Sequence, residues 1–347
     1  MNRLVDIKSM DLEELSLYLV SIEEQKFRGK QLYSWIHEKG AVTFDEMTNL
    51  SKTLIEKLKE NCKLTVLDTL DCKVSKEDNT KKFLFELADD QVIESVFMQY
   101  KHGNSVCISS QAGCKMGCKF CASTTSGLVR NLTPAEMLDQ IYGIERETGE
   151  KIGNIVIMGT GEPFDNYENL LKFIKIINSP EGRNIGQRSI TVSTCGIVPR
   201  IYDFANECSQ VNLAISLHAP NDAIREQIMP IARKYTFEEL MESVKYYLNK
   251  TNRRITFEYG LINGLNDSKD DAYALSRALH GMLCHVNLIP INSIDGKKFE
   301  KSSPESTKLF IKILESKKIT TTLRRTLGDD VDAACGQLRR KHSEKKS

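Results

Sequence analysis

Four cysteines lie close together in the stretch CISSQAGCKMGCKFCAS, which begins at Cys107 and ends at Ser123. Three of them, Cys114, Cys118 and Cys121, have the spacing C-x3-C-x2-C. Clustered thiols in a short segment are typical of a metal site, a disulfide framework or a reactive centre. The first question is therefore which of these chemistries the three closely spaced thiols serve, and whether Cys107 belongs with them.

The number of available ligands favours an iron–sulfur cluster over a structural zinc site. Gly113 and Gly117 allow the tight turns that bring three sulfurs around one centre. A structural zinc ion needs four ligands, and the nearest histidine, His102, lies on the far side of a predicted strand. A four-iron cluster held by three thiolates leaves one iron open, and that iron can chelate a small molecule. A zinc site with a distant fourth ligand, or unligated thiols, are the alternatives.

The composition is that of a globular protein without a membrane segment. The chain has 347 residues, of which 40% are hydrophobic and 27% charged, with a net charge of +1. It contains no long apolar run, and its N-terminus lacks the features of a secretory signal. We therefore expect a cytoplasmic protein whose ten cysteines are free thiols, metal ligands or redox catalysts. The isolated thiols are expected to be packing residues: Cys62, Cys72, Cys208 and Cys284.

The pattern of apolar residues predicts four parts. Residues 1–62 have helical periodicity at 11–20, 28–40 and 51–62, so they form a small helical domain. Residues 63–103 alternate between apolar and polar side chains, which indicates two or three strands that form a β-rich connector. Residues 104–338 form the core, and 339–347 are a basic tail.

Strands and helices alternate through the core, which predicts an α/β fold with a parallel sheet, open or closed into a full or partial barrel. Strands are expected at 105–109, 154–159, 189–194, 211–217, 255–261, 285–291 and 319–325, and helices at 134–148, 167–177, 197–206, 237–249, 269–281 and 304–316. In such folds the functional residues collect at the carboxyl ends of the strands. The cysteine cluster and the sequence GTGEP both follow predicted strands.

The cysteine spacing resembles that of the radical S-adenosylmethionine (SAM) enzymes, whose signature CxxxCxxC follows the first strand of a partial (βα)6 barrel. Phe120 supplies the aromatic residue that precedes the last cysteine of this signature. The resemblance implies a 4Fe–4S cluster held by Cys114, Cys118 and Cys121, with the open iron bound to SAM. An electron from the cluster then cleaves SAM to a 5′-deoxyadenosyl radical, which requires a closed and dry barrel mouth.

The same resemblance assigns SAM contacts at the ends of later strands. The motif GEP, formed by Gly161, Glu162 and Pro163, is similar to the family motif whose backbone and glutamate hold the amino group of SAM. The remaining candidates for contacts with the ribose, carboxylate and adenine are Ser193, Ser216, Leu217, His218 and Asn292. Taken alone, a histidine at the end of a strand is as often a structural residue as a ligand neighbour.

A narrower resemblance rests on Cys335 in DAACGQL, together with Cys107, the segment RNLT and the segment SLHAPND. These motifs resemble the RlmN family of dual-specificity RNA methyltransferases, which methylate C2 of adenosine in 23S rRNA and in some tRNAs. The resemblance implies that Cys335 takes a methyl group from a first SAM molecule, and that a second SAM supplies the radical. It also implies a transient covalent adduct between RNA and Cys335, which Cys107 resolves by forming a disulfide.

Glu94 in the segment VIESVF matches the family position assigned to a proton acceptor. Whether Glu94 or Cys107 removes the C2 proton is left open by the sequence. Without the resemblance, the alternating pattern of this strand would favour a surface carboxylate at this position.

The resemblance implies 23S rRNA and tRNA as partners, an electron donor such as flavodoxin or ferredoxin, and a monomeric enzyme without a membrane partner. The near-neutral net charge means that any RNA contact must depend on local basic patches. Lys26, Arg28 and Lys30 are candidates for phosphate contacts.

Three other functions remain as alternatives. The first is methylation of adenosine at C8, as in the related antibiotic-resistance enzymes, although Pro163 and the sequence SQAGC favour C2. The second is a non-catalytic iron–sulfur protein that binds RNA, in which the open iron and the two extra cysteines would have no use. The third is another radical SAM activity such as a glycyl-radical activase, which has no use for Cys335.

Overall fold

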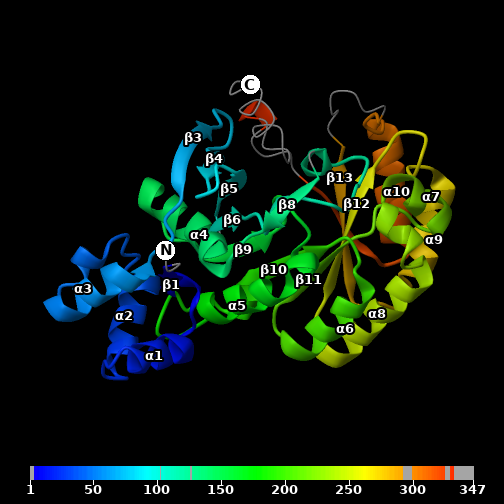
Figure 1. Cartoon of the computed structure of the whole chain (residues 1–347). Coiled ribbons are helices and arrows are strands. Elements are labelled where there is room, and N and C mark those ends of the chain that lie inside the picture. Colours follow the sequence, from blue (N-terminus) through cyan, green and yellow to red (C-terminus); the bar gives the residue numbers. More distant parts are fainter. Residues whose placement is uncertain (1–3, 102, 126, 292–298, 325–328, 332–347) are drawn as a thin grey trace.

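The structure is a computed structural model. It describes residues 4–101, 103–125, 127–291, 299–324 and 329–331. A long mixed sheet runs through the molecule, and three short N-terminal helices lie at one side of it (Figure 1).

The three predicted N-terminal helices are present as α1 (Leu12–Ser21), α2 (Arg28–His37) and α3 (Lys52–Asn61). Asp11 caps α1 through its side chain, which accepts hydrogen bonds from the backbone N–H groups of Glu13 and Glu14. The short strand β1 (Val5–Asp6) and the 3-10 helix η1 (Ile7–Ser9) precede α1, the 3-10 helix η2 (Phe44–Glu46) lies between α2 and α3, and β2 (Cys62–Lys63) follows α3 and pairs in parallel with β1.

The main sheet has ten strands in the order β14-β13-β12-β11-β10-β9-β6-β5-β4-β3. The seven strands from β6 to β14 pair in parallel, which confirms the predicted α/β core. Their bounds are β6 (Gly103–Cys107), β9 (Asn154–Ile157), β10 (Ile190–Thr194), β11 (Asn212–Ser216), β12 (Ile255–Leu261), β13 (Cys284–Pro290) and β14 (Thr320–Leu323). Three antiparallel strands extend the sheet beyond β6: β3 (Asp68–Val74), β4 (Lys81–Glu86) and β5 (Val92–Tyr100).

Helices cover the apolar outer face of the parallel strands (Figure 1). The six predicted core helices are present as α4 (Pro134–Thr148), α5 (Tyr167–Ile177), α6 (Val198–Glu207), α8 (Phe237–Thr251), α9 (Lys269–Ala278) and α10 (Pro304–Ser316). Each follows one strand and returns the chain to the next, so the carboxyl ends of the parallel strands share one edge. The remaining 3-10 helices are η3 (Ala122–Thr124), η4 (Pro163–Asn166), η5 (Gln187–Ser189), η6 (Pro230–Arg233) and η7 (Asp329–Val331).

Two elements beside the cysteine cluster were not predicted. A short helix, α7 (Asp222–Ile228), follows β11, and its N-terminus is capped by the side chain of Asn221. A small hairpin of β7 (Gln111–Gly113) and β8 (Leu128–Asn131) encloses the cysteine segment. Both elements are too short to produce a clear periodic pattern in the sequence.

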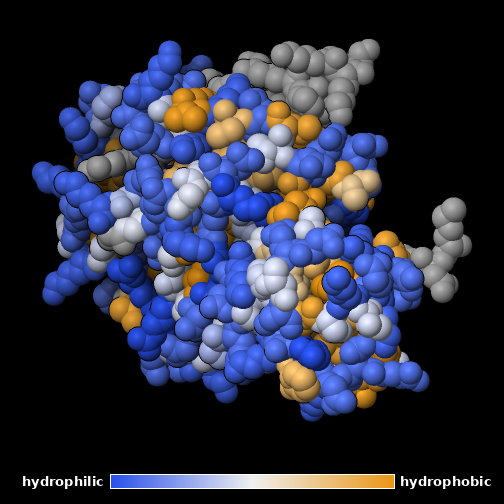
Figure 2. Space-filling model, turned by 90° about the vertical axis from the view of Figure 1, so that its left-hand side faces the viewer, coloured by the Kyte–Doolittle hydropathy of each residue, from blue (hydrophilic) through white to orange (hydrophobic). Residues whose placement is uncertain are grey.

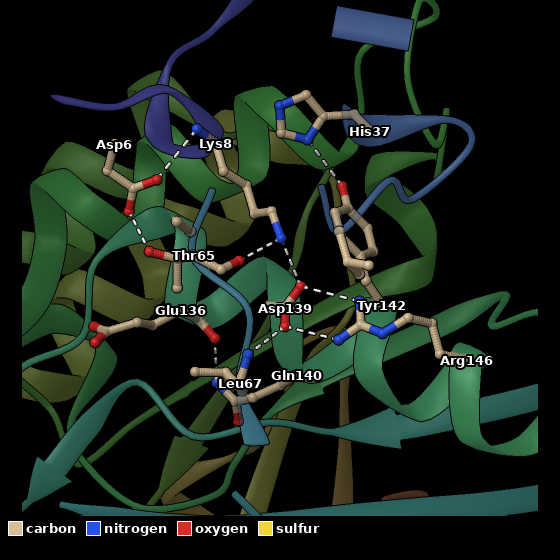
Figure 3. A network of polar contacts seen from close by, with 12 residues as sticks. Asp6, Lys8, His37, Thr65, Leu67, Glu136, Asp139, Gln140, Tyr142 and Arg146 are labelled. Carbon is tan, nitrogen blue, oxygen red and sulfur yellow. Dashed lines mark hydrogen bonds and ion pairs between the residues drawn. The ribbon is translucent and has the colours of Figure 1, made fainter. Parts of the chain in front are cut away.

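A buried polar network attaches the N-terminal segment to α4 (Figure 3). The ammonium of Lys8 lies 2.7 Å from Oδ1 of Asp139, and both side chains are excluded from solvent. The other carboxylate oxygen, Oδ2, accepts hydrogen bonds from the backbone N–H of Leu67 at 2.7 Å and from Arg146 at 3.0 Å. The N-terminal helices are therefore anchored to the core by a fully partnered ion pair rather than by apolar contacts alone.

No helix in the described residues is long and apolar enough to cross a membrane. On the side of the molecule where the N-terminal helices lie, hydrophilic side chains cover most of the surface and hydrophobic ones form separate small groups (Figure 2).

Candidate active site

The inner face of the sheet carries the polar residues of the predicted site. Residues that are opposite one another on paired strands point to the same face, so the strand register assigns side chains to faces. The register places Cys107, Ser193, Ser216, Glu258 and Asn287 on this inner face. The alternate positions are buried apolar residues under the helices, such as Ile155 and Val192. The sheet therefore presents one polar face and one apolar face.

The cysteine segment is a loop held between β7 and β8. Gly113 has φ of +79°, and a Cβ at this position would lie 2.0 Å from the carbonyl oxygen of Gly127, so only glycine fits. The backbone N–H of Cys114 donates to that same carbonyl at 2.9 Å. The backbone N–H of Lys119 donates to the carbonyl of Ile228 at the end of α7. The unpredicted hairpin and α7 therefore shape the loop on which the three thiols lie.

The three predicted cluster ligands lie close enough to influence one another electrostatically. Cys114 and Cys118 are buried and Cys121 is half-buried. Burial, together with the neighbouring thiols, raises the pKa of Cys114 to about 11 and that of Cys118 to about 12. These raised pKa values disfavour the thiolate forms of Cys114 and Cys118, which a bound iron would stabilise.

The donor set fits a four-iron cluster better than a single metal ion. Within the described residues, no three His, Cys, Asp or Glu side chains converge on one metal-ion position. In a 4Fe–4S cluster each thiolate binds a different iron, so its sulfurs lie farther apart than those around one zinc ion. The all-sulfur donor set, the surrounding apolar residues and the spacing of the loop are consistent with such a cluster.

The GEP segment forms a tight turn after β9. Gly161 has φ of +113°, and a Cβ there would lie 2.6 Å from the side chain of Gln111. The carboxylate of Glu162 accepts hydrogen bonds from the backbone N–H groups of Phe164 at 3.0 Å and Cys195 at 2.7 Å. The side chain of Glu162 therefore ties the loop after β9 to the loop after β10. Burial raises the pKa of Glu162, and these hydrogen bonds oppose that shift.

Ser193 and Ser216 lie beside one another at the ends of β10 and β11, with their hydroxyl oxygens 3.5 Å apart. Leu217 follows directly, and it is buried with its backbone N–H donating to the carbonyl of Glu258 at 3.0 Å. The structure thus brings together three of the predicted SAM contacts on two neighbouring strand ends.

His218 is held as a neutral imidazole. Its Nδ1 accepts a hydrogen bond from the backbone N–H of Gly260 at 2.8 Å, so the ring proton lies on Nε2. Burial, assisted by the nearby Arg225, lowers the pKa of His218 to about 3. The ring of Phe120 lies against it, with the ring centroids 4.5 Å apart. His218 therefore joins the cysteine loop to the end of β11.

Cys107 and Glu94 occupy the inner face of β6 and β5. Cys107 is half-buried and lies opposite Val96, two residues along β5 from Glu94. Burial raises the pKa of the Cys107 thiol, and the neighbouring Glu94 adds to this shift. The side chain of Glu94 is only 6% exposed, so the alternative of a surface carboxylate is wrong. Its carboxylate lies 3.5 Å from the ammonium of Lys82 on β4.

Two predicted site residues, Asn292 and Cys335, lie outside the residues that the structure describes. The last described residues before Cys335 in the sequence form η7, where the carboxylate of Asp330 accepts a hydrogen bond from the backbone N–H of Lys76 at 2.9 Å.

Sequence reasoning missed several residues that hold the site in place. Gln140 on α4 accepts hydrogen bonds from the backbone N–H of Ser109 and the hydroxyl of Ser95, both at 2.8 Å. The guanidinium of Arg225 on α7 is fully buried and donates to the carbonyl of Cys195. A polar residue on the buried face of an amphipathic helix was the available signal for Gln140. Arg225 gave no comparable signal because α7 itself was not predicted.

The predicted phosphate contacts in the N-terminal domain differ in their surroundings. Lys26 and Lys30 are exposed. Arg28 is half-buried, and its guanidinium donates to Gln31 at 2.9 Å and lies over the ring of Phe27. The two lysines are therefore the more accessible cations of this group.

Two family profiles match the chain. The profile described as the Radical SAM superfamily matches residues 108–275, and the one described as the ribosomal RNA large subunit methyltransferase N-terminal domain matches residues 5–64. These two segments contain the cysteine loop and the N-terminal helices, respectively.

Full-length relatives show the same relationship. A probable dual-specificity RNA methyltransferase RlmN from Caldanaerobacter subterraneus is 55% identical over 97% of this chain and 98% of its own length. The protein of the same name from Lachnospira eligens is 52% identical over 98% and 97%. The crystal structure of a radical SAM methyltransferase from Sphaerobacter thermophilus is 43% identical and covers 96% of this chain and 98% of its own, with a TM-score of 0.92. The chain therefore belongs to the RlmN family of radical SAM enzymes.

Proposed function

We propose that this protein methylates C2 of adenosine 2503 in 23S rRNA and of adenosine 37 in some tRNAs. The curated relatives named as dual-specificity RNA methyltransferases support this activity over nearly the whole chain. The single structural observation that carries it is the position of Cys107, which lies on the inner face of the sheet near Glu94 and apart from the cysteine loop. A cluster with a purely structural role would have no use for this additional pair.

We infer that Cys114, Cys118 and Cys121 hold a 4Fe–4S cluster whose fourth iron binds SAM. When bound, the cluster and SAM supply a 5′-deoxyadenosyl radical. The buried apolar residues around the loop, such as Ile228 and Met229, exclude water from this position. The three thiols supply the ligands. The glycines of the loop that have positive φ allow the chain to pass closely around the cluster.

The SAM contacts are inferred at the ends of β9, β10 and β11. Both oxygens of the Glu162 carboxylate accept backbone hydrogen bonds, so we infer that GEP binds the amino group through its backbone carbonyls and that Glu162 and Pro163 shape the turn. Ser193, Ser216, Leu217, His218 and Asn292 are the remaining proposed contacts.

The chemistry at the RNA base is assigned to Cys335, Cys107 and Glu94. The C2 atom of adenine lies between two ring nitrogens and is electron-poor, so it is not a nucleophile. The methyl carbon carried by Cys335 would instead be joined to it as a radical, after the 5′-deoxyadenosyl radical has taken a hydrogen atom from that methyl group. The radical adduct would then give up one electron to the iron–sulfur cluster, and Glu94 accepts the C2 proton, so that a closed-shell adduct remains on Cys335. Cys107, as a thiolate, attacks the sulfur of Cys335 and forms a disulfide while the bond between that sulfur and the carbon breaks. The electron pair of the broken bond stays with the carbon, which takes up a proton and becomes the methyl group.

We further propose that the enzyme acts as a monomer in the cytoplasm, with a flavodoxin or ferredoxin as electron donor and two SAM molecules consumed in each turnover. The absence of a long apolar helix in the described residues and the family's RNA substrates are compatible with this setting.

The position of the methyl group tests the proposal. Reconstituted enzyme is incubated anaerobically with a 23S rRNA fragment, SAM and a reductant, and the RNA is digested to nucleosides for chromatography with mass spectrometry. The expected product is 2-methyladenosine, and its absence, or 8-methyladenosine in its place, would contradict the proposal. A variant with Cys114, Cys118 and Cys121 replaced by alanine is the matched control, because it lacks the cluster ligands.

A further inference from the structure

Lys82 is a buried cation on the inner face of the sheet. Its side chain is 1% exposed, and its ammonium lies 3.5 Å from Oε1 of Glu94, which is 6% exposed. The adjacent Lys81 points to the opposite face and is only half-buried. A lysine at a strand position costs least when its ammonium stays in water, so the burial of Lys82 calls for a specific reason.

The strand register places Lys82 in line with the proposed resolving thiol. Lys82 lies opposite Val96 on β5, and Val96 lies opposite Cys107 on β6. These three side chains therefore lie side by side on one face. Glu94 precedes Val96 by two residues and points to the same face, which brings its carboxylate diagonally within reach of the long lysine side chain.

The backbone of Glu94 is also held in place. The carbonyl of Glu94 accepts a hydrogen bond from the hydroxyl of Ser109 at 2.7 Å, and Ser109 is itself held by Gln140. With the strand fixed at this point, the remaining freedom of Glu94 lies in its side chain, whose carboxylate contacts the ammonium of Lys82. The distance of 3.5 Å is longer than a tight charge-assisted hydrogen bond of about 2.8 Å, so the contact orients the carboxylate electrostatically.

We propose that Lys82 is a positioning residue for release of the methylated base, because it orients the Glu94 carboxylate beside Cys107 for acceptance of the C2 proton. This inference rests on the proposed function of Glu94 and Cys107. The buried Leu84 lies opposite Glu94 on the same face, and both members of the pair are shielded from solvent, so water is a poor replacement for the lysine as a counter-charge. Lys82 contributes no group that is transferred, and its effect is confined to the step in which Glu94 acts.

The test compares K82M, K82R, E94Q and the double variant K82M/E94Q with the wild-type enzyme. K81M is the matched control, since it removes the same charge from the adjacent residue on the other face. The three measured quantities are iron content, S-methylation of Cys335 and the fraction of protein covalently joined to RNA. K82M is expected to retain iron and S-methylation, while release of methylated RNA slows by about tenfold or more and the adduct accumulates.

The other variants separate positioning from a structural role. K82R keeps the charge and is expected to recover most of the release rate, and K82M/E94Q is expected to be no slower than E94Q alone. The double variant also removes both buried charges, so it remains informative if K82M alone folds poorly. Unaltered release in K82M, or equal loss in K81M, would overturn the proposal for Lys82. Normal release in E94Q would instead contradict the proposed role of Glu94 itself.

Discussion

The carboxylate of Glu162 accepts a hydrogen bond from the backbone N–H of Cys195 at 2.7 Å, and this contact joins the loops after β9 and β10. Glu162 is buried, and its other oxygen accepts from the backbone of Phe164. The glutamate therefore shapes the proposed SAM site from inside the protein.

Replacement of Glu162 by glutamine is expected to weaken SAM binding by about tenfold. The amide NH2 group of glutamine would face a backbone N–H, so one of the two backbone hydrogen bonds would be lost. Isothermal titration of SAM against the reconstituted protein measures this change. The control is Glu168→Gln, since the side chain of Glu168 is 82% exposed on α5. Equal SAM affinity in the wild type and the Glu162 variant would contradict the structural role of this carboxylate.

The buried pair of Lys8 and Asp139 predicts a large loss of stability on removal of the lysine. Lys8→Met leaves a buried carboxylate with Arg146 and a backbone N–H as its remaining partners, which should cost about 3 kcal/mol of unfolding free energy. Urea denaturation monitored by circular dichroism measures the change. The exposed pair formed by Lys59 and Asp45 is the control, and Lys59→Met should cost far less, because solvent screens this pair. Similar losses in the two variants would be inconsistent with an anchoring role for Lys8.

The ion pair of Lys8 and Asp139 also predicts that the unfolding free energy depends on pH. Lys8 and Arg146 hold the pKa of Asp139 below its ordinary value of 3.8, against the opposing effect of burial. A carboxylate whose pKa is lower in the folded state contributes stability above its ordinary pKa and loses it as the pH falls through the lowered value. The unfolding free energy should therefore fall below about pH 4, and Asp139→Asn should flatten this fall. Parallel pH profiles in the variant and the wild type would argue against the assignment.

The exposed lysines of the N-terminal domain predict the salt dependence of RNA binding. Replacing Lys26 and Lys30 by glutamine should weaken binding and reduce the slope of log K against log salt by about 0.7–0.9 for each lost phosphate contact. Filter binding at several salt concentrations measures the slope. Lys245→Gln, an exposed lysine on α8, is the control. An unchanged slope in the double variant would mean that RNA does not contact this patch.

The regular elements could be predicted closely from the sequence, because burial on one face leaves a periodic pattern. The bounds of α4, α5 and β12 match the predicted ranges. The cysteine motif and Cys107 were likewise visible, since their spacing is local. By contrast, α7 and the hairpin of β7 and β8 are too short to produce a pattern, and they shape the loop that carries the thiols.

Long-range partners could not be predicted, since they depend on how distant elements pack. Lys8 and Asp139 are separated by 131 residues, and neither sequence neighbourhood indicates a partner. The pairing of Lys82 with Glu94 depends on the register of β4 and β5, because a shift of one residue would turn one of the two side chains to the other face of the sheet. An alternating pattern separates the two faces of a strand, but it does not indicate what covers the polar face. The burial of Glu94 therefore could not be predicted from the pattern alone.

In the proposed reaction, Cys107 resolves a covalent adduct on Cys335 and takes no part in holding the cluster. The most direct measurement is mass spectrometry of the protein–RNA species formed by the reconstituted Cys107→Ala variant with RNA and SAM, alongside its iron content. We expect the Cys107→Ala variant to retain iron and to form an RNA adduct attached through Cys335, whereas Cys118→Ala should lose both. Loss of iron in Cys107→Ala, or release of methylated RNA at the wild-type rate, would contradict it.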